Sequence, residues 1–524
     1  MRRFVLIVLT LCAIFATRQS SGAQPAGPAS TSKANDWQFE PVPTPKEGDE
    51  TAVLYGFITH GKSALVEGSI GDAFSLWQTE GLKLKRVCWP DGKPLVAQTL
   101  TVVSAGDPAY YLFRASKEPE TPFELVEIRD GVAALLKNET GLVLGEGEGY
   151  DFGFADRSLL ALALAEKDKR AAVRVSQGSF KALTLPGGKP VVARRPRIEQ
   201  NPDGTLFVDP QDGTPRLLLK DGKLDPIADL PEPEGAATKW TRPALYLPGC
   251  VLEVGGDDKE VNRAWIIRNS KAEWIKDEKG RVFEGAELYA KWVAGQPLLH
   301  RIEDDPKDRD KSVHSFYRVD GTVAKLLPWL APEPAQNVDF IDDPDLGLLC
   351  SYADKVVKGP DGDEEVRESL LCRVTEKGIV PVAYPGGERV DTLGETFPQR
   401  LGSRILICCY RGEVTNRKPV WCELKGEVAH LLQMPAAVDG ESPTFKGADA
   451  AGAVLFSLRA DSSPDRDKGI KCDPSIAYAD DQVVKWFKDQ DGEMFSDVVP
   501  ADQYVYLLTG AGDSPQTIRR AHRK

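Results

Sequence analysis

Histidine is the side chain best suited to general-base catalysis and metal binding near neutral pH. This chain of 524 residues has five, namely His60, His300, His314, His430 and His522. His300 and His314 flank one loop, but no pair has the spacing of known metal ligands. We therefore expect no histidine-based catalytic or metal site.

Motifs that hold a nucleophile or a phosphate are missing from the sequence. No Gly-x-Ser-x-Gly segment occurs, and no glycine-rich loop follows a strand and opens a helix. The diglycines Gly187-Gly188 and Gly386-Gly387 follow proline and fit turns that join repeats. We predict no catalytic residue and no cofactor, and enzymatic activity is the less favoured interpretation.

Acidic loops raise the question of calcium, which prefers oxygen ligands at alternate loop positions and a glycine that lets the loop fold back. Four loops are rich in aspartate, at residues 303–311, 341–347, 359–365 and 461–468. None has the calcium spacing. Asn201–Gly204 matches part of a calcium loop, but Phe207 stands where a carboxylate is required. We interpret these loops as solvated and predict no bound metal.

A short pattern returns about every 50 residues: an apolar run, a turn usually centred on glycine, and a second apolar run. The turn centres are Gly81, Gly131, Gly178, Gly222, Ser270, Gly321, Gly378, Gly426 and Asp481. One such unit cannot bury its own faces, so neighbouring copies must stack on one another.

Each unit can be divided into four short strands. In the fourth unit we expect strands at residues 191–198, 205–208, 215–220 and 223–230, with equivalent second strands at 53–56, 110–113, 251–254, 348–352, 405–410 and 454–458. Residues 159–172 are rich in helix formers. The repeat register nevertheless favours a strand at 160–164, with a helix as the alternative.

Four strands in each unit are typical of β-propeller blades, so we predict an all-β, propeller-like ring with nine clear units and a partial tenth. The tenth unit lacks a fourth strand of its own. We expect Trp37–Phe39 to complete it and so to remove an exposed sheet edge. Because propellers usually have four to eight blades, a large ring, irregular insertions and two smaller rings all remain open.

Residues 201–230, NPDGTLFVDPQDGTPRLLLKDGKLDPIADL, carry a family resemblance. They resemble the bacterial secreted repeats that are built on an ELW-x-x-DGT core followed by a short apolar strand. The periodicity is similar over about 470 residues, although no copy holds the full Glu-Leu-Trp signature. The resemblance implies a propeller-like fold and no particular activity.

The cysteines give one further signal. Aligned repeats place Cys350 and Cys408 at the same point of the second strand, and Cys372 and Cys422 at the same point of the third. In an oxidising compartment the pairs Cys350–Cys372 and Cys408–Cys422 are disulfide candidates, and free cysteines in the core are the alternative. Only one of Cys408 and Cys409 can face Cys422, because neighbouring side chains on a strand point to opposite faces. The repeat alignment favours Cys408.

The N-terminus has the layout of a cleaved secretory signal peptide, with Arg2 and Arg3, an apolar run at residues 4–16, and small residues before Gln24. We expect residues 1–23 to be the signal peptide, residues 24–50 to be a flexible linker, and residues 51–524 to be the repeat domain. The mature protein is then expected outside the cytoplasm, periplasmic or secreted, without stable membrane insertion.

The charge of the chain excludes one class of partner. The formal net charge is −13, and loss of three arginines with the signal peptide brings it to about −16. Binding of nucleic acid depends on neutralising phosphates with Lys and Arg. We therefore predict no nucleic-acid partner.

The links between second and third strands are the long, charged ones, at residues 115–122, 304–311, 353–368, 411–418 and 459–474. They must open on the face opposite the tight turns between third and fourth strands. Loops gathered on one face of a scaffold commonly bind partners, and tolerated length variation is the alternative. We expect a secreted binding or scaffold module with a protein or polysaccharide partner on this face. A propeller hydrolase or lyase for an extracellular polymer is the alternative.

Overall fold

The computed structural model describes residues 37–523 with gaps at 119–120, 148, 153–157, 167, 210–216, 221–222, 227–229, 237, 243, 307, 332–336, 342–345, 360–361, 393–397, 402–403, 412–417, 435–443, 449–453, 460–473, 480–482, 489–494 and 510–515. The predicted signal peptide and the turn centres Gly222 and Asp481 lie outside the described residues. Phe39–His522 forms one compact unit.

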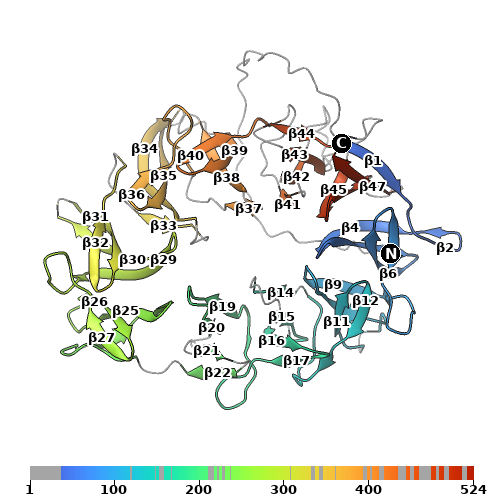
Figure 1. The fold of residues 1–524 in the computed structure, drawn as a ribbon, viewed down its shortest axis with the longest axis horizontal. Coiled ribbons are helices and arrows are strands. Elements are labelled where there is room, and N and C mark those ends of the chain that lie inside the picture. Colours follow the sequence, from blue (N-terminus) through green and yellow to red (C-terminus); the bar gives the residue numbers. More distant parts are fainter. Residues whose placement is uncertain are drawn as a thin grey trace. The chain divides into compact units, whose positions relative to one another are not determined.

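All described elements are β-strands, so the all-β prediction is confirmed. Ten antiparallel sheets, numbered here 1 to 10 along the chain, each contain four strands in succession (Figure 1). None of the described residues belongs to a helix that could cross a membrane. This repeated four-stranded meander is the strand order of propeller blades.

Sheets 1 to 3 consist of β4 (Val53–His60), β5 (Ser63–Ile70), β6 (Ala73–Glu80) and β7 (Lys83–Arg86); β9 (Thr99–Ser104), β10 (Ala109–Arg114), β11 (Glu124–Arg129) and β12 (Val132–Leu135); and β14 (Tyr150–Asp151), β15 (Leu159–Ala163), β16 (Arg170–Ser176) and β17 (Ser179–Ala182). Short additional strands are β8 (Val96–Ala97) on β6, β13 (Lys137–Asn138) on β17 and β18 (Val192–Ala193) on β16.

Sheets 4 to 6 consist of β19 (Arg197–Gln200), β20 (Leu206–Asp209), β21 (Leu217–Lys220) and β22 (Lys223–Pro226); the interrupted first strand β23 (Trp240–Thr241) and β24 (Leu245–Leu247), then β25 (Cys250–Gly256), β26 (Asn262–Arg268) and β27 (Lys271–Trp274); and β29 (Glu287–Val293), β30 (Gln296–Asp305), β31 (Asp308–Asp320) and β32 (Val323–Leu327). The short strand β28 (Glu284–Gly285) pairs with β26.

Sheets 7 to 9 consist of β33 (Val338–Phe340), β34 (Leu348–Gly359), β35 (Gly362–Thr375) and β36 (Gly378–Pro381); β37 (Gln399–Leu401), β38 (Arg404–Arg411), β39 (Lys418–Lys425) and β40 (Val428–Leu431); and β41 (Thr444–Ala448), β42 (Val454–Arg459), β43 (Pro474–Ala479) and β44 (Val484–Trp486). Sheet 10 consists of β45 (Phe495–Ala501), β46 (Tyr504–Thr509), β47 (Thr517–Arg523) and β1 (Trp37–Val42), and β2 (Lys46–Glu47) pairs with β3 (Glu50–Thr51).

The predicted closure by the N-terminal segment is confirmed, because β1 is the outer strand of sheet 10 and lies next to β47 (Figure 1). Arg520 Nε donates a hydrogen bond to Glu40 at 3.0 Å. Phe39 stacks on Phe495 with 5.7 Å between ring centroids. Residues 37–50, which the sequence placed in a linker, therefore supply the last strand of the repeat domain and the short hairpin that follows it.

The sequence around Leu159–Ala163 is compatible with both a helix and a strand, and burial of its side chains favours the strand. Leu159–Ala163 forms β15, as the repeat register predicts, and all five of its residues are buried. Leu160 and Leu162 pack in the core shared with sheet 2, and Leu159 packs in the core shared with sheet 4, so both faces of the strand are covered. The burial of apolar surface outweighs the helix propensity of Leu and Ala.

Two predicted strand positions are wrong. Residues 53–56 belong to the first strand of sheet 1, because a two-residue turn after His60 leads into β5, the true second strand. The segment predicted as the first strand of the fourth unit is split instead. Val192–Ala193 forms β18 on sheet 3, and the first strand of sheet 4 starts at Arg197.

The hydrophobic core lies between neighbouring sheets, and each sheet packs on the next. Shared buried clusters include Leu54 with Val499 (sheets 1 and 10), Leu76 with Val126 (1 and 2), Leu125 with Leu160 (2 and 3), Leu159 with Val208 (3 and 4), Leu252 with Leu299 (5 and 6), Leu298 with Leu349 (6 and 7), Leu371 with Ile407 (7 and 8) and Leu406 with Ala477 (8 and 9). Ring contacts join sheets 4 and 5 (Phe207–Tyr246) and sheets 9 and 10 (Phe487–Phe39). Contacts therefore join every pair of successive sheets from 1 to 10, and sheet 10 contacts sheet 1.

Several connecting segments tie one sheet to the next by hydrogen bonds. The amide of Cys88, after sheet 1, donates to Gly131 of sheet 2 at 3.2 Å, and Lys137, after sheet 2, donates to Gly178 of sheet 3 at 3.0 Å. After sheets 1, 3, 5 and 7 the segment also forms a hairpin bridge, at Cys88–Pro94, Thr184–Pro190, Lys276–Val282 and Ala383–Arg389. The two diglycines lie in these hairpins, so the repeats have a longer period of two sheets.

Candidate functional site

A cleft of about 780 Å³ opens between sheets 2 and 3, at the end that carries the turns between third and fourth strands. We call it the hairpin cleft. Its lining consists of Asp107, Pro108, Tyr110, Glu127, Arg129, Ser158, Val175, Ser176, Gln177 and Gly178. This volume is within the range that small ligands and partner side chains occupy.

One wall of the hairpin cleft is the link between β9 and β10, which is held by sheet 1. His60 Nδ1 donates to the Gly106 carbonyl at 2.6 Å, and the Gly106 amide donates to Thr59 O at 3.0 Å. His60 is buried. The first histidine of the chain therefore positions the wall that carries Asp107 and makes no contact that suggests catalysis.

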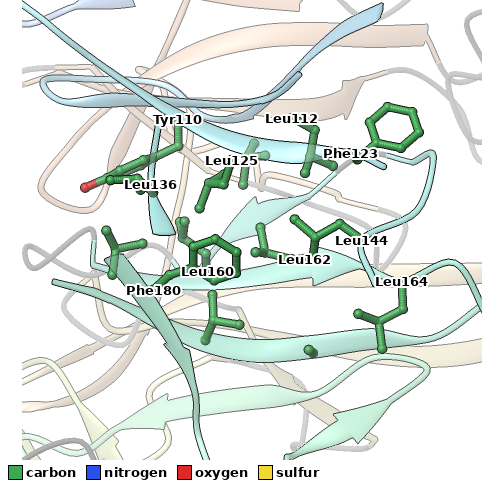
Figure 2. Close-up of a cluster of buried hydrophobic side chains, with 14 residues drawn as sticks. Tyr110, Leu112, Phe123, Leu125, Leu136, Leu144, Leu160, Leu162, Leu164 and Phe180 are labelled. Carbon is green, nitrogen blue, oxygen red and sulfur yellow. The ribbon is translucent and has the colours of Figure 1, made fainter. Parts of the chain in front are cut away.

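The floor of the cleft belongs to the apolar core that sheets 2 and 3 share. Tyr110 and Val175 line the cleft and are members of a buried cluster with Leu125, Leu160 and Phe180. Figure 2 shows Tyr110 at the edge of this cluster, with its hydroxyl oxygen directed away from the other labelled side chains. The packed core keeps the polar groups of the rim at fixed positions.

The two carboxylates on the rim of the cleft differ in whether they are paired with a cation. Glu127, on β11, forms an ion pair with Arg129 at 3.2 Å. Asp107 is exposed and forms no ion pair with any residue that the structure describes. The amide of Gln177 and the hydroxyl of Ser176 face the same cleft. The cleft can therefore offer a free carboxylate and neutral hydrogen-bonding groups to a ligand.

A second group of chemically distinctive residues comes from sheets 1, 2, 9 and 10. Glu67 on β5 lies beside Tyr111 of β10 and near Asp497 of β45. Burial raises the pKa of Glu67 to about 7, contact with Tyr111 opposes this rise, and the charge of Asp497 adds to it. The Tyr111 hydroxyl itself lies outside ordinary hydrogen-bond geometry. Asp497 accepts from the Phe57 amide at 3.0 Å and pairs with Lys446 at 2.9 Å.

Sheet 5 contains another buried carboxyl group. Glu253 on β25 is 6% exposed, and burial raises its pKa to about 7. A hydrogen bond from Thr241 opposes this rise, and the charge of Glu232 adds to it. Glu67 and Glu253 can therefore each hold a proton near neutral pH, which sequence spacing alone could not show.

The structure brings His300 and His314 together, although their spacing suggested no pair. Strands β30 and β31 place them on one face, and His300 Nε2 lies 2.9 Å from His314 Nδ1. Burial lowers the pKa of His300 to about 3 and also lowers that of His314. Both rings are neutral at pH 7. The described residues contain no group of three metal-binding side chains, here or elsewhere.

The strand register corrects the predicted cysteine pairs. Cys350 lies opposite Leu371, one residue before Cys372, so these two side chains lie on opposite faces of sheet 7. In sheet 8, Cys422 lies opposite Ile407, which puts Cys409 rather than Cys408 on its face. Cys409 and Cys422 belong to one buried cluster, and Cys350, Cys372, Cys408 and Cys422 are all thiols, not disulfides, in this structure.

The long links between second and third strands are only partly described. Residues 353–359 and 362–368 were predicted as a loop but extend β34 and β35 as a regular hairpin. Residues 304–311 are largely strand as well. Most of the links at 411–418 and 459–474 lie outside the described residues.

Comparison with known proteins gives no close relative. No protein-family model matches the chain, and no curated protein is similar to it in sequence. Among solved structures, the chain is similar to the β-propeller domain of the Trilobed protease from Pyrococcus furiosus (10% identity, 70% of this chain and 90% of that one, TM-score 0.23). YCF48 from Cyanidioschyzon merolae (9%, 92% and 98%, 0.25) and the WD40 domain of SCAP from fission yeast (10%, 93% and 98%, 0.24) are comparable. The sheets of this chain, rather than these low scores, define its propeller-like fold.

Proposed function

We propose that the protein is a propeller-like binding module that works outside the cytoplasm and holds a protein partner in its hairpin cleft. The observation that carries this proposal is the exposed carboxylate of Asp107, which pairs with none of the described residues, at the rim of a cleft of about 780 Å³. The signal-peptide pattern of residues 1–23 supports the location. Binding needs no catalytic residue, in agreement with the motifs absent from the sequence.

The chemistry of the cleft favours a basic side chain on the partner. Asp107 is available for an ion pair, whereas the charge of Glu127 is already shared with Arg129. A charge-assisted hydrogen bond to Asp107 would be stronger than a neutral one. Apolar atoms of the same segment would pack on Tyr110 and Val175, which form the floor.

Affinity capture from the extracytoplasmic fraction of the source cells tests the proposal. We expect the partner to be retained by the wild-type protein and lost with Asp107→Asn, which removes the free charge, and with Ser176→Arg, which fills the cleft. Asp130→Asn is the matched control, because Asp130 is exposed on the adjacent β11–β12 turn and does not line the cleft. Equal capture of the same proteins by all four forms would refute the cleft as the binding site.

The face that carries the long links between second and third strands is a second proposed surface for the partner. Its best-described part is the hairpin of β34 and β35, which reaches Gly359 and Gly362. A variant with this hairpin shortened by residues 355–366 separates the two surfaces. Loss of the partner in this variant, together with retention by Asp107→Asn, would move the binding site to the long links.

A hydrolase or lyase for an extracellular polymer is a second candidate function, and Glu67 favours it. A carboxyl group that is protonated near pH 7 can act as a general acid, and Asp497 supplies a second carboxylate nearby. Release of new reducing ends or unsaturated ends from polysaccharides would be the assay. Activity that Glu67→Gln abolishes would support an enzyme, and absence of activity across neutral and acidic polymers would leave the binding module.

A further inference from the structure

Aromatic and cationic side chains alternate along the first strands of sheets 5, 6 and 7. Trp240 and Arg242 come from sheet 5, Tyr289 and Lys291 from β29, and Phe340 from β33. The Arg242 guanidinium carbon lies 5.2 Å from the centroid of Trp240 and 3.9 Å from that of Tyr289. Lys291 Nζ lies 5.9 Å from the centroid of Phe340. We call these five residues the aromatic–cation row.

Two glycines on the neighbouring strand make room for the Trp240 ring and its surroundings. Trp240 lies opposite Gly256 in the register of β23 and β25, and any side chain at Gly256 would overlap the indole ring. A Cβ at Gly255 would lie only 2.7 Å from the ring of Trp265. The indole rests on bare backbone, yet 40% of Trp240 is exposed. A ring that is supported in this way and partly exposed is suited to stacking.

Arg242 is held in place without a carboxylate partner. The first strand of sheet 5 breaks between Thr241 and Leu245, and the register with β25 shifts by one residue there. Such a bulge re-aims the side chains that it contains. Arg242 forms no ion pair with any described residue, and its buried Nε makes no hydrogen bond. Its guanidinium is stacked and pre-oriented, and is therefore suited to bind an oxyanion in a bidentate manner.

We propose that the aromatic–cation row binds an anionic polysaccharide that carries carboxylates. A sugar ring would stack on the exposed side of Trp240, and its carboxylate would pair with Arg242. Lys291, one sheet further along, would meet a later unit of the same polymer. The exposed Glu287, which accepts from the Tyr289 hydroxyl at 2.9 Å, is available to sugar hydroxyls. This site lies in sheets 5 to 7 and does not depend on the hairpin cleft of sheets 2 and 3.

The alternative polymer with charge and stacking surfaces is single-stranded nucleic acid. Proteins that bind it line a groove with many cations, since every nucleotide brings a phosphate. The row has two cations in a chain with a net charge of −13. Of the three rings in the row, Trp240 is exposed, whereas Tyr289 and Phe340 are half-buried, so the row offers one open stacking surface rather than one for each successive base. A polysaccharide that binds through one stacked sugar and its carboxylate fits the row better.

Affinity electrophoresis of the full chain in native gels tests the proposal. The gels contain polygalacturonate, neutral dextran or a single-stranded oligothymidine. We expect retardation by polygalacturonate alone, with the apparent dissociation constant raised roughly tenfold or more by Arg242→Gln and by Trp240→Ala. Lys291→Gln should weaken binding less, and high salt should weaken it for every form.

Arg411 provides the matched control. Its guanidinium carbon also lies over a tyrosine, 5.3 Å from the centroid of Tyr384, but it is already paired with Glu388 at 2.6 Å. Arg411→Gln should leave polygalacturonate binding unchanged. Thermal melting of each variant shows whether it is folded. Equal weakening by Arg242→Gln and Arg411→Gln, equal retardation by dextran, or retardation by the oligonucleotide instead would overturn the proposal.

Discussion

Glu67 holds a proton near neutral pH because its carboxyl group is largely shielded from water where sheets 1, 2 and 10 meet. Its neighbours are a buried tyrosine and Asp497, whose own charge is stabilised by Lys446 and the Phe57 amide. The ionised form of Glu67 would place a second negative charge beside Asp497. Because the pKa of Glu67 lies near neutral, Glu67 is a group through which pH can change the stability of the fold.

We expect Glu67 to make the folded state less stable as pH rises. The folded pKa, about 7, lies above the ordinary glutamate value of 4.5, so the folded state binds the proton more tightly than the unfolded state does. This stabilisation is complete below pH 4.5 and is lost as pH rises through 7. The free energy of unfolding should fall by up to about 3 kcal/mol over this range.

Urea denaturation at pH 5 and pH 8 measures this effect. Glu67→Gln resembles the protonated carboxyl group and should abolish the fall in the free energy of unfolding that is due to Glu67. The pH dependence that is due to Glu253 should remain. Glu80→Gln, exposed at the end of β6, is the control and should behave as the wild type does. An unchanged pH dependence in Glu67→Gln would show that this carboxyl does not control stability.

Strand register decides what the cysteines can do. Repeat alignment equated positions in neighbouring units and so paired Cys408 with Cys422, but it could not fix which residues of adjacent strands lie opposite each other. A shift of one residue moves every side chain to the other face. The register in the structure therefore separates both predicted pairs and places Cys409 beside Cys422.

We expect Cys350, Cys372, Cys408 and Cys422 to be thiols in the purified protein. Alkylation in denaturant without a reductant, followed by peptide mapping, should recover all four as alkylated peptides, because neither predicted pair shares a face. A linked peptide containing Cys350 and Cys372 would contradict the register of sheet 7. A linked peptide containing Cys422, joined to either Cys408 or Cys409, would contradict the thiols of sheet 8.

The sequence patterns predicted the sheets better than the candidate functional sites. Bulges in the first strands of several sheets explain part of this difference. Alternating apolar residues and glycine turns set the period of about 50 residues, the strand at Leu159–Ala163 and the closing strand β1. The first strands of sheets 1, 2, 9 and 10 each contain a register irregularity, at Tyr55, Val103, Lys446 and Ser496. Such irregularities have no clear sequence signal, and they direct side chains of different sheets toward one another.

The candidate sites also depend on contacts that no single repeat contains. The hairpin cleft needs Asp107 from one sheet and Gln177 from the next, and the aromatic–cation row spans three sheets. The sequence did contain a partial signal for the row, since Trp240 and Arg242, like Tyr289 and Lys291, are two residues apart and each pair lies at a first strand. Sequence reasoning missed this signal because it searched for catalytic spacing rather than for stacked cations.

At the scale of the whole molecule, stability depends on the junction between the two ends of the chain. Sheet 10 is incomplete without β1, and its residues Val499 and Leu508 share a buried cluster with Leu54 of sheet 1. Tyr506, also in sheet 10, donates to the Gly81 carbonyl of sheet 1 at 2.9 Å. A strand from the N-terminal part of the chain therefore covers the edge of a C-terminal sheet that would otherwise be free to pair with other chains.

We expect Phe39→Ala to weaken this junction in particular. Phe39 is buried, stacks on Phe495 and contacts the edge of Phe487, and removal of such a ring costs about 3–5 kcal/mol. Hydrogen exchange should then rise in β1, β46 and β47 and also in β4, because the contact between sheets 10 and 1 loosens with the closing strand. The matched control is Phe180→Ala, which removes a fully buried ring from the core of sheets 2 and 3. Phe180→Ala should raise hydrogen exchange around β10 and β16 and leave β1, β4, β46 and β47 protected. If Phe39→Ala raised exchange no more at the two ends than Phe180→Ala does, closure by β1 would not be the contact that keeps sheets 10 and 1 together.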